Sequence, residues 1–284
     1  MKTSIVFVLA GLITSVARGQ EKEAYHIFNA NGKKVTYEKM LKSLKSADIV
    51  LFGELHNNPI SHWFEYELAV DLSKGAKLTL GAEMFEADNQ QAVNDYLSGK
   101  IDAKGLDSLA RLWPNYKTDY APLLNLAKEQ HLNFVATDIP RRFASLVYKN
   151  GFEALDSLSN EEKEWIAPLP VKYDAELPWY KDIVKAAEGH GGPNLPKAQA
   201  IKDATMAYFI LANYVQGTKF LHFDGAYHSD NYGGIVWYLK QSKPDIHYMT
   251  ITTVSQEDNN HLSDDNLHKA DFIICVDEHM TPTY

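Results

Sequence analysis

Short apolar runs that end in a charged or imidazole residue recur along this chain of 284 residues. Between the runs, apolar positions recur every three or four residues, which is typical of amphipathic helices. This alternation predicts an α/β fold, a mostly parallel sheet flanked by helices. The predicted strands are 48–52, 78–80, 133–137, 219–223, 247–254 and 271–276. The predicted helices of this core are 37–46, 60–74, 87–98, 105–113 and 120–130.

Five residues with chemically active side chains stand at or just after the ends of the first four predicted strands. They are Glu54, His56, Glu83, Asp138 and His228. Ligands of open α/β sheets bind at the carboxyl ends of the strands, where the loops leave a crevice. We therefore expect these five side chains to face one cleft.

The segment 143–217 carries helical patterns and no convincing strand, and it is too long for a plain loop. We expect a helical insertion here, either a subdomain or a lid. Ser159 and Glu162 within it have the spacing of a helix capping box. The α/β core would then comprise 20–142 and 218–284.

The first 19 residues combine a basic start, an apolar stretch and small residues near a plausible cleavage point. This pattern is typical of a secretory signal peptide, so we expect cleavage before Gln20 and an extracytoplasmic protein, either periplasmic or secreted. The only cysteine, Cys275, lies in an apolar run and is interpreted as a core residue. Because no lipobox cysteine stands near the cut, we expect no lipid anchor of the bacterial lipoprotein type.

Composition limits the classes of partner. Hydrophobic residues make up 45% of the sequence, which indicates a globular protein with a core of its own. The formal net charge is −9, and removal of Lys2 and Arg18 with the signal peptide would make the chain more acidic. This charge disfavours nucleic acid and anionic membranes as partners.

Glu54 and His56 are two residues apart, so on extended backbone their side chains share a face. Such a pair can bind a divalent metal or act as a general acid and base. Alternatively, Glu54 satisfies backbone N–H groups at a helix start and His56 caps the loop. Glu83 and His228 at neighbouring strand ends favour a functional role for the group. The histidines interpreted as solvated and without a role are His62, His131, His247 and His261.

Arg141 and Arg142 follow Asp138 closely and leave the same end of the predicted sheet. A guanidinium there can clamp a carboxylate or a phosphate of a ligand. An intramolecular ion pair with Glu54, Glu83 or Asp138 is the alternative, and the sequence leaves both open.

Six short segments occur in a characteristic order along most of the chain, from about 37 to 240. They are Gly53-Glu54-Leu55-His56, Gly81-Ala82-Glu83-Met84-Phe85, Asp138-Ile139-Pro140-Arg141-Arg142, Ile166-Ala167-Pro168-Leu169-Pro170, the stretch from Lys197-Ala198-Gln199-Ala200 to Ala204-Thr205-Met206-Ala207, and Gly225-Ala226-Tyr227-His228. Together they resemble the ChaN family of haem-binding, iron-regulated proteins.

The resemblance implies an α/β sheet protein with a helical insertion that binds haem. It also implies a tyrosine as the iron ligand and pairs of subunits that enclose cofacial haems. The same sheet core is similar to that of erythromycin-esterase-like and Tiki-type hydrolases, in which a Gly-Glu-x-His segment belongs to the catalytic site. Members of the ChaN family are often lipoproteins, so the missing lipobox cysteine is a departure from the family pattern.

A haem pocket needs apolar walls, an iron ligand and donors for two propionates. The predicted insertion is rich in aromatic residues, and Tyr173, Tyr180 and His190 are the candidate axial ligands within it. Arg141 and Arg142 complete the candidate haem-binding set. For each candidate ligand, ordinary packing of a small helical subdomain is the alternative.

Two functions therefore stand as hypotheses. The first is a secreted haem-binding protein in haem or iron uptake or sequestration, with haem as cofactor, a homodimer as assembly and an outer-membrane haem receptor as partner. The second is a hydrolase that activates water, with or without a divalent metal. Its catalytic residues would be Glu54, His56, Glu83, Asp138 and His228. A structural interaction module would leave the strand-end charges without a purpose.

Overall fold

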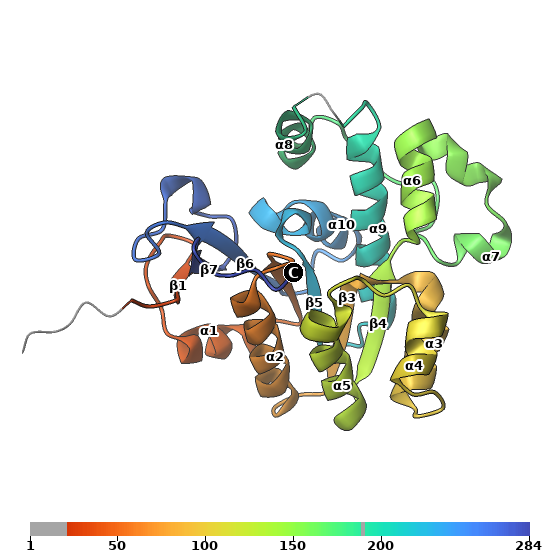
Figure 1. Ribbon diagram of the computed structural model, residues 1–284. Coiled ribbons are helices and arrows are strands. Elements are labelled where there is room, and N and C mark those ends of the chain that lie inside the picture. Colours follow the sequence, from red (N-terminus) through yellow and green to blue (C-terminus); the bar gives the residue numbers. More distant parts are fainter. Residues whose placement is uncertain (1–21, 189–190) are drawn as a thin grey trace, which may run out of the picture.

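The computed structural model describes residues 22–188 and 191–284. The predicted signal peptide, residues 1–19, and the candidate ligand His190 lie outside the described residues. Within these residues, seven strands form one sheet in the order β1-β7-β6-β2-β5-β3-β4 (Figure 1). The strands are β1 (Tyr25–Asn29), β2 (Ile49–Glu54), β3 (Leu78–Glu86), β4 (Asn133–Asp138), β5 (Lys219–Gly225), β6 (Tyr248–Gln256) and β7 (Phe272–Asp277).

The predicted fold class is confirmed, because every neighbouring pair in this sheet is parallel except β1 and β7. All six predicted strands are present. β3 is longer than predicted, so Glu83 lies within the strand instead of after it. The sequence pattern missed β1, a short edge strand without a continuous apolar run.

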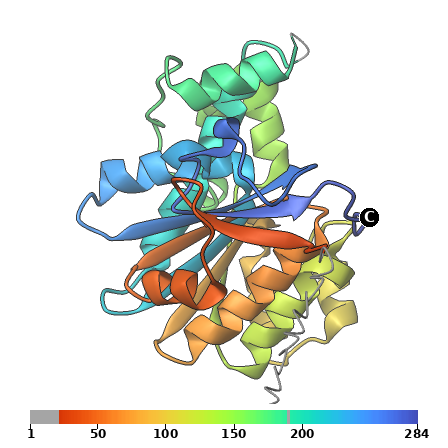
Figure 2. The same ribbon diagram turned by 90° about the vertical axis from the view of Figure 1, so that its left-hand side faces the viewer.

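Helices cover both faces of the sheet. On one face lie α1 (Tyr37–Leu44), α2 (Pro59–Ser73), α3 (Gln90–Leu97), α4 (Ala103–Leu109) and α5 (Ala121–Glu129). On the other face lie α9 (Leu195–Asn213) and α10 (Gly234–Ser242). Successive strand residues point to opposite faces, so Val50 and Phe52 of β2 pack in the first layer and Ile49 and Leu51 in the second. Figure 2 shows the strands between these layers, with the orange and yellow helices on one side and the cyan and green helices on the other.

The segment 143–217 is helical, as expected. Its elements are the remainder of α6 (Arg141–Asn150), then α7 (Asn160–Lys163), α8 (Pro178–Ala186) and α9. The capping box of Ser159 and Glu162 is present at the start of α7. The first half of α9 packs against α6 in a small apolar core, whereas its second half packs on the sheet. The predicted domain boundaries therefore stay a prediction, because α9 belongs to both packing units.

Short helical turns connect the larger elements. They are η1 (Ala87–Asn89), η2 (Tyr116–Tyr120), η3 (Phe152–Ser157), η4 (Ala226–His228), η5 (Asp230–Tyr232) and η6 (Asp264–Asn266). Cys275 is fully buried on β7, which fits its interpretation as a core residue. None of the helices in the described residues combines the length and the apolar composition that a bilayer crossing needs.

Candidate functional site

A cavity of about 820 Å³ lies at the carboxyl ends of β2 and β5. We call it the histidine cavity, and its polar wall includes Glu54, His56, Glu83, Gln199, Lys202 and His228. The structure thus brings four of the five predicted strand-end residues to one cleft, as the topology of a parallel sheet requires. Asp138, the fifth, borders a neighbouring cavity instead.

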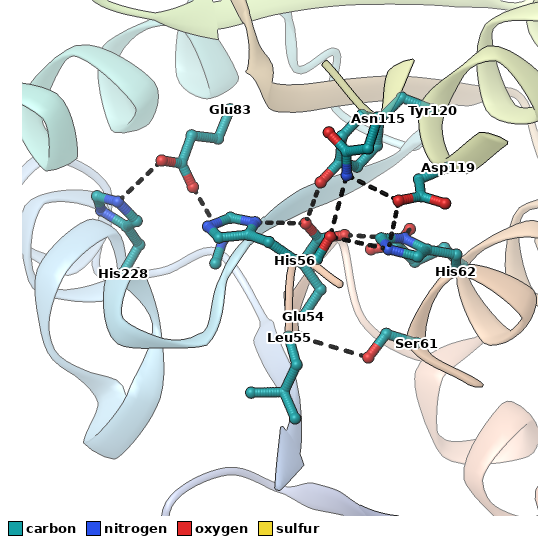
Figure 3. A network of polar contacts seen from close by, with 12 residues as sticks. Glu54, Leu55, His56, Ser61, His62, Glu83, Asn115, Asp119, Tyr120 and His228 are labelled. Carbon is teal, nitrogen blue, oxygen red and sulfur yellow. Dashed lines mark hydrogen bonds and ion pairs between the residues drawn. The ribbon is translucent and has the colours of Figure 1, made fainter. Parts of the chain in front are cut away.

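Glu54 ends β2, and His56 follows in the loop before α2. Nδ1 of His56 lies 2.6 Å from Oε1 of Glu54 (Figure 3). Burial would raise the pKa of Glu54, but the hydrogen bonds that it accepts, first among them the one from His56, lower this pKa to about 2. An ionised carboxylate only accepts hydrogen bonds, so Nδ1 of His56 carries a proton. Nε2 is then the atom of His56 that can gain or lose a proton at the cavity.

Glu83 is the centre of a second charged group in this cavity. Its Oε1 lies 2.8 Å from Nζ of Lys202 and 3.1 Å from Nε2 of His228, and its Oε2 accepts the N–H of Gly225 at 2.8 Å. Nδ1 of His228 lies 2.5 Å from Oδ1 of Asp203. Burial opposes a charge on His228, but Glu83 and Asp203 outweigh it and raise its pKa to about 10. His228 is therefore a buried imidazolium between two acids.

Because Gly225 has no side chain, His56 and Glu83 can both approach the end of β5. A Cβ on this glycine would lie 2.7 Å from Nε2 of His56 and 3.5 Å from Oε2 of Glu83. The first distance is too short for any side chain, so only glycine lets His56 take this position.

His62 was predicted to be solvated, and this prediction is wrong. Its side chain is only 8% exposed, because the first two turns of α2 carry His62 and Glu65 on the face beside Glu54. We call Glu54, His62, Glu65 and Asp119 the acidic cluster. Burial opposes a charge on His62, but the carboxylates of Glu54 and Glu65, 3.3 Å and 3.2 Å from its Nδ1, raise its pKa to about 11. The spacing of His62 and Glu65, one helical turn apart after a strand end, was the signal in the sequence.

Asp138 ends β4 and is buried. Burial raises its pKa to about 7, although the charge of Lys202 acts in the opposite direction. Oδ2 of Asp138 lies 3.6 Å from Nζ of Lys202. Lys202 borders the histidine cavity and the neighbouring one, so it connects Asp138 to Glu83.

The neighbouring cavity has a volume of about 870 Å³ and runs along α6. We call it the arginine cavity. Its polar wall includes Arg111, Arg141, Arg142, Tyr148 and Lys149, and its apolar wall includes Leu112, Trp113, Pro114, Ala144 and Ala198. Trp113 borders both cavities and packs against the ring of His56, with the ring centres 4.9 Å apart.

The arginines of this cavity are not equivalent. Arg142 lies 2.5 Å from Asp88 and stacks over Phe143, with 4.3 Å between the guanidinium carbon and the ring centre. Arg111 also pairs with Asp88. Neither arginine of the Arg141–Arg142 pair takes part in an ion pair with Glu54, Glu83 or Asp138 among the described residues. Arg141 is exposed and takes part in none of the described ion pairs, so its guanidinium is available to a ligand.

Tyr173 and Tyr180, the candidate axial ligands within the described residues, line neither cavity. Tyr180 is 1% exposed, and its hydroxyl lies 3.5 Å from that of Tyr238. Tyr173 is half-buried and packs against Phe152 and Tyr180. Tyr180 would have to leave its packed position to reach an iron ion, and His190 lies outside the described residues.

Sequence reasoning missed two groups of cavity residues. The first comes from α9 and consists of Gln199, Lys202 and Asp203. The second is Tyr148, which is 41% exposed at the arginine cavity. Tyr148 follows Arg141 by seven residues, so the two share a face of α6, and this spacing could have pointed to it.

Comparison with solved structures gives the class of fold. The chain is similar to ChaN of Campylobacter jejuni, a protein with cofacial haem binding, at 18% identity and a TM-score of 0.68. The match covers 90% of this chain and 98% of the other. A mutant of the erythromycin esterase EreC in its open conformation matches at 11% identity and a TM-score of 0.51, over 90% of this chain and 98% of the other. At these identities the matches show a shared fold.

The sequence shows the family. Residues 40–239 match the family described as haem-binding uptake, Tiki superfamily, ChaN, and the chain belongs to this family. A curated relative, Protein RETICULATA-RELATED 5, chloroplastic, of Arabidopsis thaliana, is 28% identical over 144 residues, which cover 48% of this chain. The matched part spans only 19% of the length of that relative.

Proposed function

We propose that this protein binds haem in the arginine cavity and takes part in haem or iron uptake outside the cytoplasm. The observation that carries the proposal is the combination of residues on α6. Arg141 and Tyr148 share one exposed face of this helix and line a cavity of about 870 Å³. This volume lies within the range of about 300–1,000 Å³ that small-molecule and cofactor sites occupy.

The residues of the arginine cavity match the chemical needs of haem. Trp113, Leu112 and Ala144 supply apolar wall for the porphyrin. Arg141 supplies a guanidinium for a propionate, because charge-assisted hydrogen bonds to carboxylates are strong. Tyr148 supplies an exposed phenol, and a phenolate is a known type of axial ligand for haem iron. Bound haem would supply the iron that is stored or passed on.

Ferric haem titration tests this proposal. We expect a saturable visible absorption band with one haem per chain. Weak absorbance changes that never saturate would contradict it. Variants Tyr173→Phe and Tyr180→Phe test the earlier ligand predictions in the same experiment, and we expect both to keep the band because neither side chain lines the cavity.

The assembly and destination of the protein belong to the same proposal. Cofacial haem binding in the Campylobacter jejuni relative supports a homodimer in which two arginine cavities face each other. A haem receptor of the outer membrane would be the partner that exchanges haem. Sedimentation of the protein with and without haem tests the dimer, and a monomer at both conditions would contradict it.

We propose hydrolysis in the histidine cavity as a second function, because one observation favours it. The Glu54 carboxylate fixes Nδ1 of His56 at 2.6 Å, so Nε2 is oriented to take a proton from water. Hydrolysis of a chromogenic ester by the wild type and by His56→Ala tests this function. We expect the variant to lose the rate above background, and equal rates would contradict the proposal.

A further inference from the structure

The acidic cluster lies behind the histidine cavity and turns three donor atoms toward one another. Among the described residues, one ligand atom each from Glu54, His62 and Glu65 lie within 4.8 Å of one another, and all three residues are buried. Nδ1 of His62 lies 3.3 Å from an oxygen of Glu54 and 3.2 Å from an oxygen of Glu65. Ligands about 2.0–2.1 Å from a tetrahedral metal ion lie about 3.3 Å apart. The spacing is therefore that of atoms around one small cation.

We propose that Glu54, His62 and Glu65 bind a divalent transition-metal ion. One imidazole and two carboxylates form a mixed nitrogen and oxygen donor set, which suits zinc, manganese or ferrous iron. The site is separate from the arginine cavity, and no residue of it lines that cavity. The proposal does not depend on haem binding.

One carboxylate oxygen of Glu54 is held by hydrogen bonds, and the other is not. Its Oε1 accepts the hydroxyl of Tyr120 at 2.7 Å and Nδ1 of His56 at 2.6 Å (Figure 3). Its Oε2 is left to face His62 and has no hydrogen-bond partner among the described residues. Oε1 of Glu65, a residue with 0% exposure, also has no partner among them. Buried carboxylate oxygens are unfavourable without a partner, and a bound cation would provide one.

His62 is oriented by its second nitrogen. Nε2 lies 3.4 Å from Oδ2 of Asp119 and 3.2 Å from the carbonyl of His56. Oδ2 of Asp119 in turn accepts the amide of Asn115 at 2.7 Å. Metal-binding histidines commonly donate their other N–H to a carboxylate in this way, which fixes the ring and turns the first nitrogen to the ion.

Calorimetric titration of the haem-free full chain tests the proposal. After treatment with a chelator, the protein is titrated with zinc chloride and with manganese chloride. We expect one ion per chain for at least one of these metals. Glu65→Gln keeps the volume of the side chain and removes a ligand, so we expect affinity to fall about 100-fold or more. Asp119→Asn should weaken binding by about 10- to 100-fold, because it disturbs the orientation of His62.

The matched control is His261→Gln, which removes an exposed histidine that pairs with Asp258. This variant should bind the metal as the wild type does. Circular dichroism checks that Glu65→Gln folds, and anomalous diffraction of the metal-loaded wild type locates the ion if it does not. The proposal is overturned if the folded wild type binds no metal, if Glu65→Gln binds it equally well, or if the ion lies elsewhere.

Discussion

The histidine cavity and the arginine cavity hold their charges in opposite ways. In the histidine cavity, Glu83 is buried and neutralised by Lys202 and His228. In the arginine cavity, Arg141 and Tyr148 are exposed and face solvent. Paired buried charges fix the positions of side chains, as catalysis or metal binding requires. An exposed guanidinium beside apolar walls is suited to contact an anionic, partly apolar ligand. The two cavities therefore suit different tasks, although Trp113 and Lys202 line both.

The largest expected effect comes from pH, because it acts on two buried histidines at once. In the metal-free protein, the pKa values of His62 and His228 are raised from 6.5 to about 11 and about 10. The folded state thus keeps protons that the unfolded state releases above pH 6.5. Their stabilisation is complete below pH 6.5 and is lost as pH rises through about 10 for His228 and about 11 for His62.

Urea unfolding at intervals between pH 6.5 and 10 measures this loss. We expect the free energy of unfolding to fall throughout this range. The exposed-residue variant His261→Gln should give the same profile. A free energy of unfolding that stays constant to pH 10 would show that the buried histidines are neutral.

Removal of one acid from each cavity tests whether buried and exposed charges contribute differently to stability. Glu83→Ala leaves Lys202 and His228 without their shared counter-charge, so we expect a loss of about 3–5 kcal/mol in the free energy of unfolding. Glu86→Ala, on the same strand, removes one of the two acidic partners of the half-exposed Arg111 and should lose less than about 1 kcal/mol. Urea unfolding at pH 6.5 compares them, and equal losses would refute the distinction.

Gly225→Ala should have a smaller effect on stability. The new Cβ would meet Nε2 of His56 at 2.7 Å, and such overpacking has a cost of about 1–3 kcal/mol. Gly75→Ala is the control, because nothing lies within 4 Å of its new Cβ. We expect thermal unfolding to show a lower Tm for the first variant only. An unchanged Tm would mean that His56 is free to move aside.

Arg141→Ala should have the smallest effect on stability, within about 0.5 kcal/mol, because its side chain is exposed and makes no described ion pair. Its effect should instead appear in haem affinity. Loss of one charge-assisted contact to a propionate predicts a Kd about tenfold higher. Lys181→Ala, which removes an exposed lysine of α8, is the control for net charge. Equal Kd values for both variants would argue against a propionate contact at Arg141.

The sequence was sufficient for the sheet and for its carboxyl edge. Continuous apolar runs identify parallel strands, and topology alone then gathers Glu54, Glu83 and His228. The sequence pattern could not show which helix residues pack into the site. Lys202 reaches Glu83 only because α9 packs across both the sheet and α6, a contact between positions 119 residues apart. His62 was missed because a polar sequence context was mistaken for a solvated one.

The candidate iron ligands illustrate the same limit of sequence reasoning. Tyr173 and Tyr180 were chosen because aromatic residues are dense in the insertion, yet density does not separate packed rings from exposed ones. Tyr180 is 1% exposed, whereas Tyr148 is 41% exposed beside two arginines. The position of α6 beside the arginine cavity distinguishes them, and the seven-residue spacing of Arg141 and Tyr148 was the signal of it in the sequence.

The most direct test is a ferric haem titration of the wild type, Tyr148→Phe and Tyr227→Phe, followed by visible spectroscopy. Tyr227 is the matched control, since it is 71% exposed and lines the histidine cavity. We expect a tyrosinate-type spectrum in the wild type and in Tyr227→Phe, and its loss in Tyr148→Phe. A spectrum that survives in Tyr148→Phe and disappears in Tyr227→Phe would place haem in the histidine cavity instead of the arginine cavity.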